Sequence, residues 1–326
     1  MTFQSFRRLA ASPRAYPLFL AAALLLLCLF LGSRTPYFLT LNNMVNICEA
    51  GSYGLILALG MTFIIAAGAI DLSVGSILSL SAILAALAIK AGLPVWTGCL
   101  IGVAAGSALG AVNGILFHLT RISPLIVTLA TAALFRGLAL IITRGVPVSL
   151  FPREFLFLGS GNIAGLEPAV WLALLLAALA FPLMRFTRFG HYVKSLGGNP
   201  VALERCGVRT GIYRTAMFGL AGGLAALVGL IMAARLNAAE VNAGLGMELF
   251  AISAVLVGGT PLTGGRASLA GTVLAVALLT VIRNGLTILA IPSYYQEFLT
   301  GAVLLAAVLF AELRIRFPGV AKQGRP

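Results

Sequence analysis

Long apolar stretches follow one another along almost the whole of this chain, with only short polar segments between them. A helix needs roughly 20 mainly apolar residues to cross the hydrocarbon core of a membrane. About ten stretches approach that length, which indicates a polytopic helical membrane protein. The expected spans are residues 17–33, 45–67, 73–90, 95–118, 123–143, 168–186, 212–234, 246–258, 268–290 and 296–313.

The scarcity of charge supports the same conclusion. Charged residues make up only 10 % of the chain, against about 25 % in a typical soluble domain. We expect an all-α fold, a bundle of about ten transmembrane helices that forms a single transmembrane domain over residues 1–326. Because the stretch 246–258 is short and 45–67 is joined tightly to 73–90, some helices are expected to be broken or re-entrant.

The net charge of +13 does not indicate a nucleic-acid partner, because the basic residues lie in short segments between apolar runs and not on one face. With the N-terminus in the cytoplasm, most Lys and Arg residues outside the spans fall on the cytoplasmic side. We therefore expect both termini in the cytoplasm. The apolar stretch near the N-terminus is expected to remain as the first span and not to be cleaved as a signal peptide.

Nothing in the chain indicates catalysis. No Walker A loop, GxxxxGK[ST], occurs, so ATP is not expected to bind in that way. His118 and His191 have no acid or nucleophile at catalytic spacing, and no cluster of His and Cys indicates a metal site. We expect no catalytic residues, no metal and no cofactor bound by this chain, so any pumping would draw its energy from a partner or an ion gradient.

A polar island, "GGNPVALERCGV" at residues 197–208, interrupts the apolar pattern. Asn199 followed by Pro200 is typical of a helix start, and Gly207 is typical of a helix end. The pattern predicts a short capped cytoplasmic helix within the segment 187–211, which would be steadied by docking on something. An ordinary polar loop is the alternative.

Two Gly-rich elbows, "GAIDLSVGS" and "GGTPLTGGRAS", lie about 190 residues apart, each between two apolar helices. Both fall on the cytoplasmic side of the expected topology. Transporters are often built from repeats with broken helices near the pathway, so the similarity indicates a structural repeat, although Gly-rich membrane sequences also produce chance similarity.

Four segments resemble the permease subunits of bacterial ABC importers for ribose, xylose, arabinose, galactofuranose and autoinducer-2. They are the polar island, "ALGMTFIIAAGAIDLSVGSILSL", "RISPLIVTLATAALFRGLALIITRG" and "ELFAISAVLVGGTPLTGGRASLAGTVL", in the order and spacing of that family from about 50 to 300. This chain departs from the family pattern at Ala69, Val201, Leu203, Pro261 and Ala267.

The resemblance implies a non-enzymatic permease in the bacterial cytoplasmic membrane that imports a monosaccharide by alternating access. It implies a cytoplasmic ABC ATPase that holds the ATP and Mg, an external sugar-binding protein, and a second permease copy or paralogue. The ATPase would couple through Gly198, Asn199, Ala202, Glu204, Arg205 and Gly207. The gating or structural elbow residues would be Gly68, Asp71, Ser73, Gly75, Gly258, Gly259, Gly264 and Gly265.

Charged residues within the spans need partners or water, because a lipid-facing charge is costly. Asp71 either supports the start of the next helix or serves gating or ATPase contact, and Glu248 suits a helix N-terminus. The partners of Arg136 and Arg283 are expected among Glu49, Asp71 and Glu248, and for Arg136 the alternative is that it lines the pathway. The pathway candidates are Asn46, Asn113, Thr128, Arg136 and Asn284, each of which could instead be a helix-packing polar group.

Three rival functions remain open from the sequence. A stand-alone secondary carrier would want acids in mid-span, and the acids here lie mostly near span ends. A membrane enzyme would want a cluster of His or acids at one membrane face. An ABC permease for branched-chain amino acids or nucleosides stays within the resemblance, and "GMTFIIAAGAIDLSVGS" favours sugars.

Overall fold

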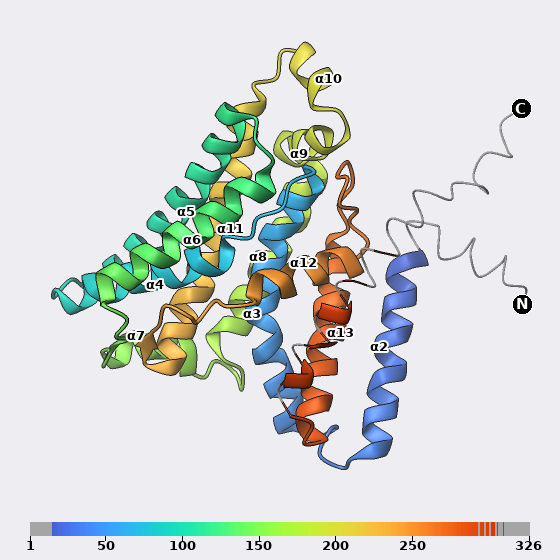
Figure 1. The fold of residues 1–326 in the computed structure, drawn as a ribbon. Coiled ribbons are helices and arrows are strands. Elements are labelled where there is room, and N and C mark those ends of the chain that lie inside the picture. The colour runs from blue at the N-terminus through green and yellow to red at the C-terminus, as the bar shows by residue number, and fades with distance from the viewer. Residues whose placement is uncertain are drawn as a thin grey trace, which may run out of the picture.

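The computed structural model describes residues 15–292 and, beyond them, residues 294–296, 298, 299, 301–303, 305 and 309. Over these residues the chain is a bundle of helices with one two-stranded sheet, which confirms the all-α class (Figure 1). Strand β1 (Val148–Ser149) pairs antiparallel with β2 (Ala238–Ala239). The helices are α2 (Ala15–Arg34), α3 (Leu41–Ala66), α4 (Val74–Lys90), α5 (Val95–Thr120), α6 (Pro124–Thr143), α7 (Arg153–Ser160), α8 (Pro168–Phe186), α9 (Arg188–Gly198), α10 (Pro200–Arg205), α11 (Thr210–Leu236), α12 (Met247–Val257) and α13 (Leu269–Ile288).

Seven of the described helices are long and apolar enough to cross a membrane: α2, α3, α5, α6, α8, α11 and α13. They coincide with seven of the expected spans. Helices α4 and α12 have 17 and 11 residues and are shorter than a full span. They occupy the expected spans 73–90 and 246–258, in agreement with the broken helices expected there. The tenth expected span, 296–313, lies largely outside the described residues.

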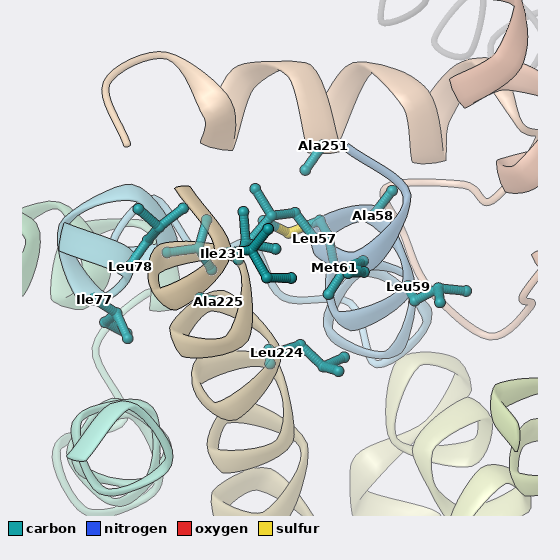
Figure 2. Close-up of a cluster of buried hydrophobic side chains, with 14 of the residues drawn as sticks. Leu57, Ala58, Leu59, Met61, Ile77, Leu78, Leu224, Ala225, Ile231 and Ala251 are labelled. Carbon is teal, nitrogen blue, oxygen red and sulfur yellow. The ribbon is translucent and has the colours of Figure 1, made fainter. Parts of the chain in front are cut away.

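Helices α3 and α11 form the centre of the bundle. In their most apolar segments 67 % and 72 % of the residues are buried, against 11 % in α2, so α2 is peripheral. Figure 2 shows Leu57 and Met61 from α3 beside Leu78 from α4, Leu224 from α11 and Ala251 from α12. The largest buried apolar cluster therefore joins long and short helices in one core.

Helix α5 packs against α4 and α11 through a stripe of glycines, one at every fourth residue. This spacing places them on one face of the helix. A Cβ at Gly106 would lie only 2.6 Å from the Gly222 carbonyl oxygen on α11. Small residues allow membrane helices to approach until their backbones touch. The stripe, all of it buried, is Gly98, Gly102, Gly106, Gly110 and Gly114.

Helix α12 lies at mid-depth of the bundle and does not cross it. A Cβ at Gly54, in the middle of α3, would collide with the Phe250 ring on α12. In Figure 2, α12 runs across the view while α3 is seen nearly end-on. Each short helix is joined to a long one by an elbow: the first elbow, 67–73, links α3 to α4, and the second elbow, 258–268, links α12 to α13.

Candidate functional site

The short helix predicted in the polar island is present as α10, which confirms that prediction. Asn199 is its N-cap, and the Asn199 Oδ1 accepts a 2.9 Å hydrogen bond from the Ala202 amide. Pro200 is the first helical residue. Gly207 follows the end of the helix with a φ of +80°, the left-handed conformation that glycine adopts without strain.

Helix α10 leaves most of its surface open. Figure 1 places it at one tip of the molecule, beyond the ends of the long helices. The Thr210 hydroxyl at the start of α11 donates a 2.6 Å hydrogen bond to the Glu204 carboxylate, which ties α10 to the core. Leu203 is the buried residue of the helix. The exposed residues are Val201, Ala202, Glu204, Arg205, Cys206 and Gly207.

Helix α9 connects α10 to the bundle. Its N-cap, Thr187, accepts a 3.2 Å hydrogen bond from the Gly190 amide, and Val193 is fully buried. The Phe189 ring lies 5.9 Å from the Phe63 ring on α3. A displacement of α10 would therefore reach α3 through α9 and reach α11 through Glu204.

Three backbone segments meet at the end of α9, in a contact that we call the glycine junction (Gly68, Gly197, Gly264 and Gly265). The Gly265 amide donates a 2.9 Å hydrogen bond to the carbonyl of Ala66, the last residue of α3. A Cβ at Gly264 would lie 2.6 Å from the Gly68 nitrogen and 2.7 Å from the Gly197 Cα, closer than real Cβ atoms come to other atoms. The first elbow, the second elbow and α9 therefore touch through bare backbone.

The other elbow glycines lie away from this junction. Gly75 faces Gly244, Gly258 packs against Gly271, and Gly259 lies against Tyr16 on α2. Of the expected elbow residues, the structure therefore brings only Gly68, Gly264 and Gly265 together. Gly197, their common neighbour, was not predicted from the sequence.

Asp71 is fully buried and supports the first elbow from within. Its Oδ1 accepts hydrogen bonds of 2.8 Å from the Ser73 amide and 2.6 Å from the Ser73 hydroxyl. The Asn113 side chain on α5 donates a 2.7 Å hydrogen bond to the same hydroxyl. Since Ser73 is the N-cap of α4, Asp71 supports the start of that helix through Ser73. With no exposed surface, Asp71 is not in a position to contact a partner protein in this conformation.

Three pathway candidates are engaged inside the bundle. Thr128 on α6 is buried and accepts a 3.1 Å hydrogen bond from the Leu72 amide, and Asn113 bonds Ser73 as above. Asn284 on α13 donates a 2.8 Å hydrogen bond to Asn43 on α3. These side chains act here as packing groups.

The other two pathway candidates reach the surface of the chain. Asn46 is exposed on α3, and Arg136 is half-buried on α6. Arg136 acts electrostatically on Glu248. Glu49 lies 3.7 Å from Arg235, whereas Arg283 lies over the Phe250 ring at 4.9 Å. Glu49 was one of the expected partners of Arg136 and Arg283, but in the structure it pairs with Arg235.

A cavity of about 230 Å³ adjoins the glycine junction and the start of α10. The Arg214 guanidinium lies on its wall, 4.7 Å from the centre of the Phe117 ring. The cavity provides room for the elbows and α9 to shift against α11. Its lining residues are Ala67, Gly68, Phe117, Leu196, Gly197, Pro200, Arg214, Met217 and Thr263.

A polar cluster that was not predicted from the sequence joins three helices at the end of α11 opposite α10. Arg235 donates hydrogen bonds of 2.7 Å to the Tyr53 hydroxyl on α3 and 2.8 Å to Glu167, which precedes α8. Burial raises the pKa of the Glu167 carboxyl, and the charge of Arg235 opposes that rise. The cluster holds α3, α8 and α11 together at this end of the bundle.

Comparison with known proteins identifies relatives that are similar to this chain over most of its length. A family model described as "Branched-chain amino acid transport system / permease component" matches residues 43–308. The ribose import permease protein RbsC of Escherichia coli (strain K12) is 37 % identical over 291 residues, which cover 88 % of this chain and 91 % of that protein.

Two further relatives carry other sugars in their names. The D-allose transport system permease protein AlsC of Escherichia coli (strain K12) is 36 % identical over 284 residues, covering 86 % of this chain and 87 % of its own. The L-arabinose ABC transporter permease protein AraH of Azospirillum brasilense is 35 % identical over 279 residues, covering 86 % and 82 %. No solved structure matches.

Proposed function

This chain belongs to the family of permease components of branched-chain amino acid transport systems, and from that premise we propose that it is the membrane-spanning permease of an ABC importer for a monosaccharide such as ribose. The relatives named for ribose, allose and arabinose support the choice of sugar. The chain is a multi-pass transport subunit of the inner membrane, and both of its termini face the cytoplasm.

The observation that carries the mechanism is the exposed, capped helix α10 beside the glycine junction. A cytoplasmic ABC ATPase with its ATP and Mg docks on α10 through Asn199, Ala202, Glu204, Arg205 and Gly207, next to Gly198. Closure of two ATPase subunits pushes α10, and α9 transmits the movement to both elbows at once, because the three segments touch at Ala66, Gly197 and Gly264. The elbows then switch the side to which the pathway opens.

The remaining partners complete an importer. An external binding protein delivers the sugar, and a second permease copy or paralogue encloses the pathway. This chain binds no cofactor of its own and does not hydrolyse ATP. The geometry of the short helices is set by the five elbow residues that lie outside the junction: Asp71, Ser73, Gly75, Gly258 and Gly259.

The experiment is gentle purification of the tagged chain from its native membrane, with mass spectrometry of the proteins that accompany it. An ABC ATPase in near-stoichiometric amount is expected, and the reconstituted complex with its binding protein is expected to import D-ribose or another monosaccharide when ATP is supplied. Recovery of the chain alone, under conditions that keep ABC complexes intact, would contradict the importer. Uptake of L-leucine in place of any sugar would contradict the cargo.

A further inference from the structure

Arg136 on α6 and Glu248 at the start of α12 carry buried polar atoms that have no hydrogen-bond partner in the described part of the chain. These atoms are Arg136 Nε and Glu248 Oε2. The two side chains interact electrostatically, yet among the described residues no ion pair or hydrogen bond joins them. An unpaired polar group is expensive away from water, so both atoms call for a further partner.

Both residues lie near the middle of the membrane. Arg136 is close to the centre of α6 (Pro124–Thr143). Glu248 is two residues before Phe250, whose ring lies against Gly54 at the centre of α3. A Cβ at Gly75, in the first turn of α4, would lie 2.5 Å from Glu248 Oε2. A cation and an anion therefore lie at mid-depth, near enough to interact electrostatically, and the anion lies beside the first turn of α4.

The backbone leading to Glu248 gives an independent indication of water at this depth. Residues 240–246 are not helical and run from the short strand β2 to α12. Glu240 and Asn242 in this segment are exposed, and Arg136 and Glu248 are half-exposed. Non-helical backbone with polar side chains occurs at membrane depth only where it is buried in protein or lines a water-filled cavity. Since Glu240 and Asn242 are exposed on this chain, the segment fits the wall of a water-filled pathway that the second permease would complete.

We propose that Arg136 and Glu248 bind the hydroxyl groups of the transported sugar at the middle of the pathway, with Glu240 and Asn242 on its approach. This inference rests on the proposed function and assigns the residues that contact the substrate. A hydroxyl group accepts a hydrogen bond from Arg136 Nε and another donates to Glu248 Oε2, so a polyol satisfies both atoms without a charge of its own. The close backbone contact between Gly75 and Gly244 lies beside Glu248 Oε2.

The first test compares uptake of D-ribose by the reconstituted complex with uptake by Arg136→Met, Glu248→Met and the double variant. Lys90→Met and Glu154→Met, at the end of α4 and on α7, are the matched controls. Each single variant is expected to lower uptake about tenfold or more, because a hydrogen bond to a charged group is lost. The ATPase should still copurify with each variant, and the controls should import at the wild-type rate.

The double variant separates a substrate contact from a structural ion pair. If the two charges only stabilise each other, removing both restores uptake, and the proposal is wrong. If they bind the sugar, the double variant imports no better than either single variant. Wild-type uptake by both single variants would also overturn the proposal, whereas a wild-type complex that imports no monosaccharide would overturn the proposed function instead.

A second measurement does not depend on the stability of those variants. Asn242→Cys is made in a chain whose four cysteines, Cys28, Cys48, Cys99 and Cys206, are replaced by Ser. A water-soluble maleimide is expected to modify it in proteoliposomes, and D-ribose with its binding protein and ATP should slow the reaction. Leu134→Cys, on the exposed apolar face of α6, is the control that should not react. Failure of Asn242→Cys to react would contradict a water-filled pathway here.

Discussion

Gly197→Ala is expected to separate ATP hydrolysis from transport, because it places one methyl group inside the glycine junction. The new Cβ would overlap the Ala66 carbonyl oxygen and lie 2.8 Å from the Gly264 Cα, whereas real Cβ atoms essentially never come within 3.0 Å of another atom. Both neighbours are backbone atoms, so no side-chain rotation relieves the overlap. Gly197 lies in α9 outside the left-handed region, so the effect is steric.

Overpacking by one methyl group costs about 1–3 kcal/mol. If that energy opposes only the conformation in which the junction is closed, the equilibrium between the two conformations shifts by roughly 5- to 150-fold. The amount of D-ribose imported per ATP hydrolysed by the reconstituted complex should decrease by a factor within that range, while the ATPase remains bound to α10. The assay is simultaneous measurement of sugar uptake and phosphate release in proteoliposomes.

A serine on the same helix provides the control. Ser195 is exposed, and its hydroxyl donates a 2.9 Å hydrogen bond to the His191 carbonyl within α9, so Ser195→Ala should keep the wild-type ratio of uptake to hydrolysis. A wild-type ratio in Gly197→Ala would refute the role of the junction. An equal loss in both variants would show that the effect comes from α9 itself and not from its contact with the elbows.

Three further predictions concern α10, the glycine stripe and the topology. Gly207→Asp should abolish uptake while the protein still inserts in the membrane. A residue with a side chain costs about 1–2 kcal/mol in the left-handed conformation, and the new charge faces the docking surface. Gly207→Asn adds no charge and should reduce uptake less. Gly110→Ala should lower the thermal unfolding midpoint in detergent, because its Cβ would overlap the Phe218 carbonyl, whereas Gly137→Ala meets no described atom within 4 Å and should not. A reporter fused after Pro326 should be active in the cytoplasm, and a periplasmic signal would overturn the proposed orientation.

The features that follow from local sequence were predicted well. An apolar run long enough to span lipid becomes a helix because its backbone groups must be satisfied internally, and the observed helices follow those runs closely. The same holds for α10, since Asn199, Pro200 and Gly207 determine its start and end through contacts within a few residues. The stripe from Gly98 to Gly114 was missed, although a small residue at every fourth position is a recognisable sign of close helix packing.

Contacts between distant segments could not be predicted in the same way. Nothing near Gly197 in the sequence shows that it meets Ala66 and Gly264, because the meeting depends on how α3, α9 and the second elbow are placed in three dimensions. Asn284 illustrates the reverse case. It was a pathway candidate by residue type, but its amide is bonded to Asn43 across the interface between α3 and α13.

Asp71 and Glu248 show why residue type and position along a helix do not suffice to identify a substrate contact. Both are acids just before or at the start of a short helix, so the same helix-end argument applied to each. In the structure Ser73 donates two hydrogen bonds to Asp71, whose side chain is fully enclosed. Glu248 is half-exposed, and its Oε2 has no hydrogen-bond partner among the described residues. Asp71 Oδ2 also lacks such a partner, so the two acids differ in exposure and not in the presence of an unpaired oxygen. The proposed substrate contact is therefore assigned to Glu248, because it is the acid that reaches the surface of the chain.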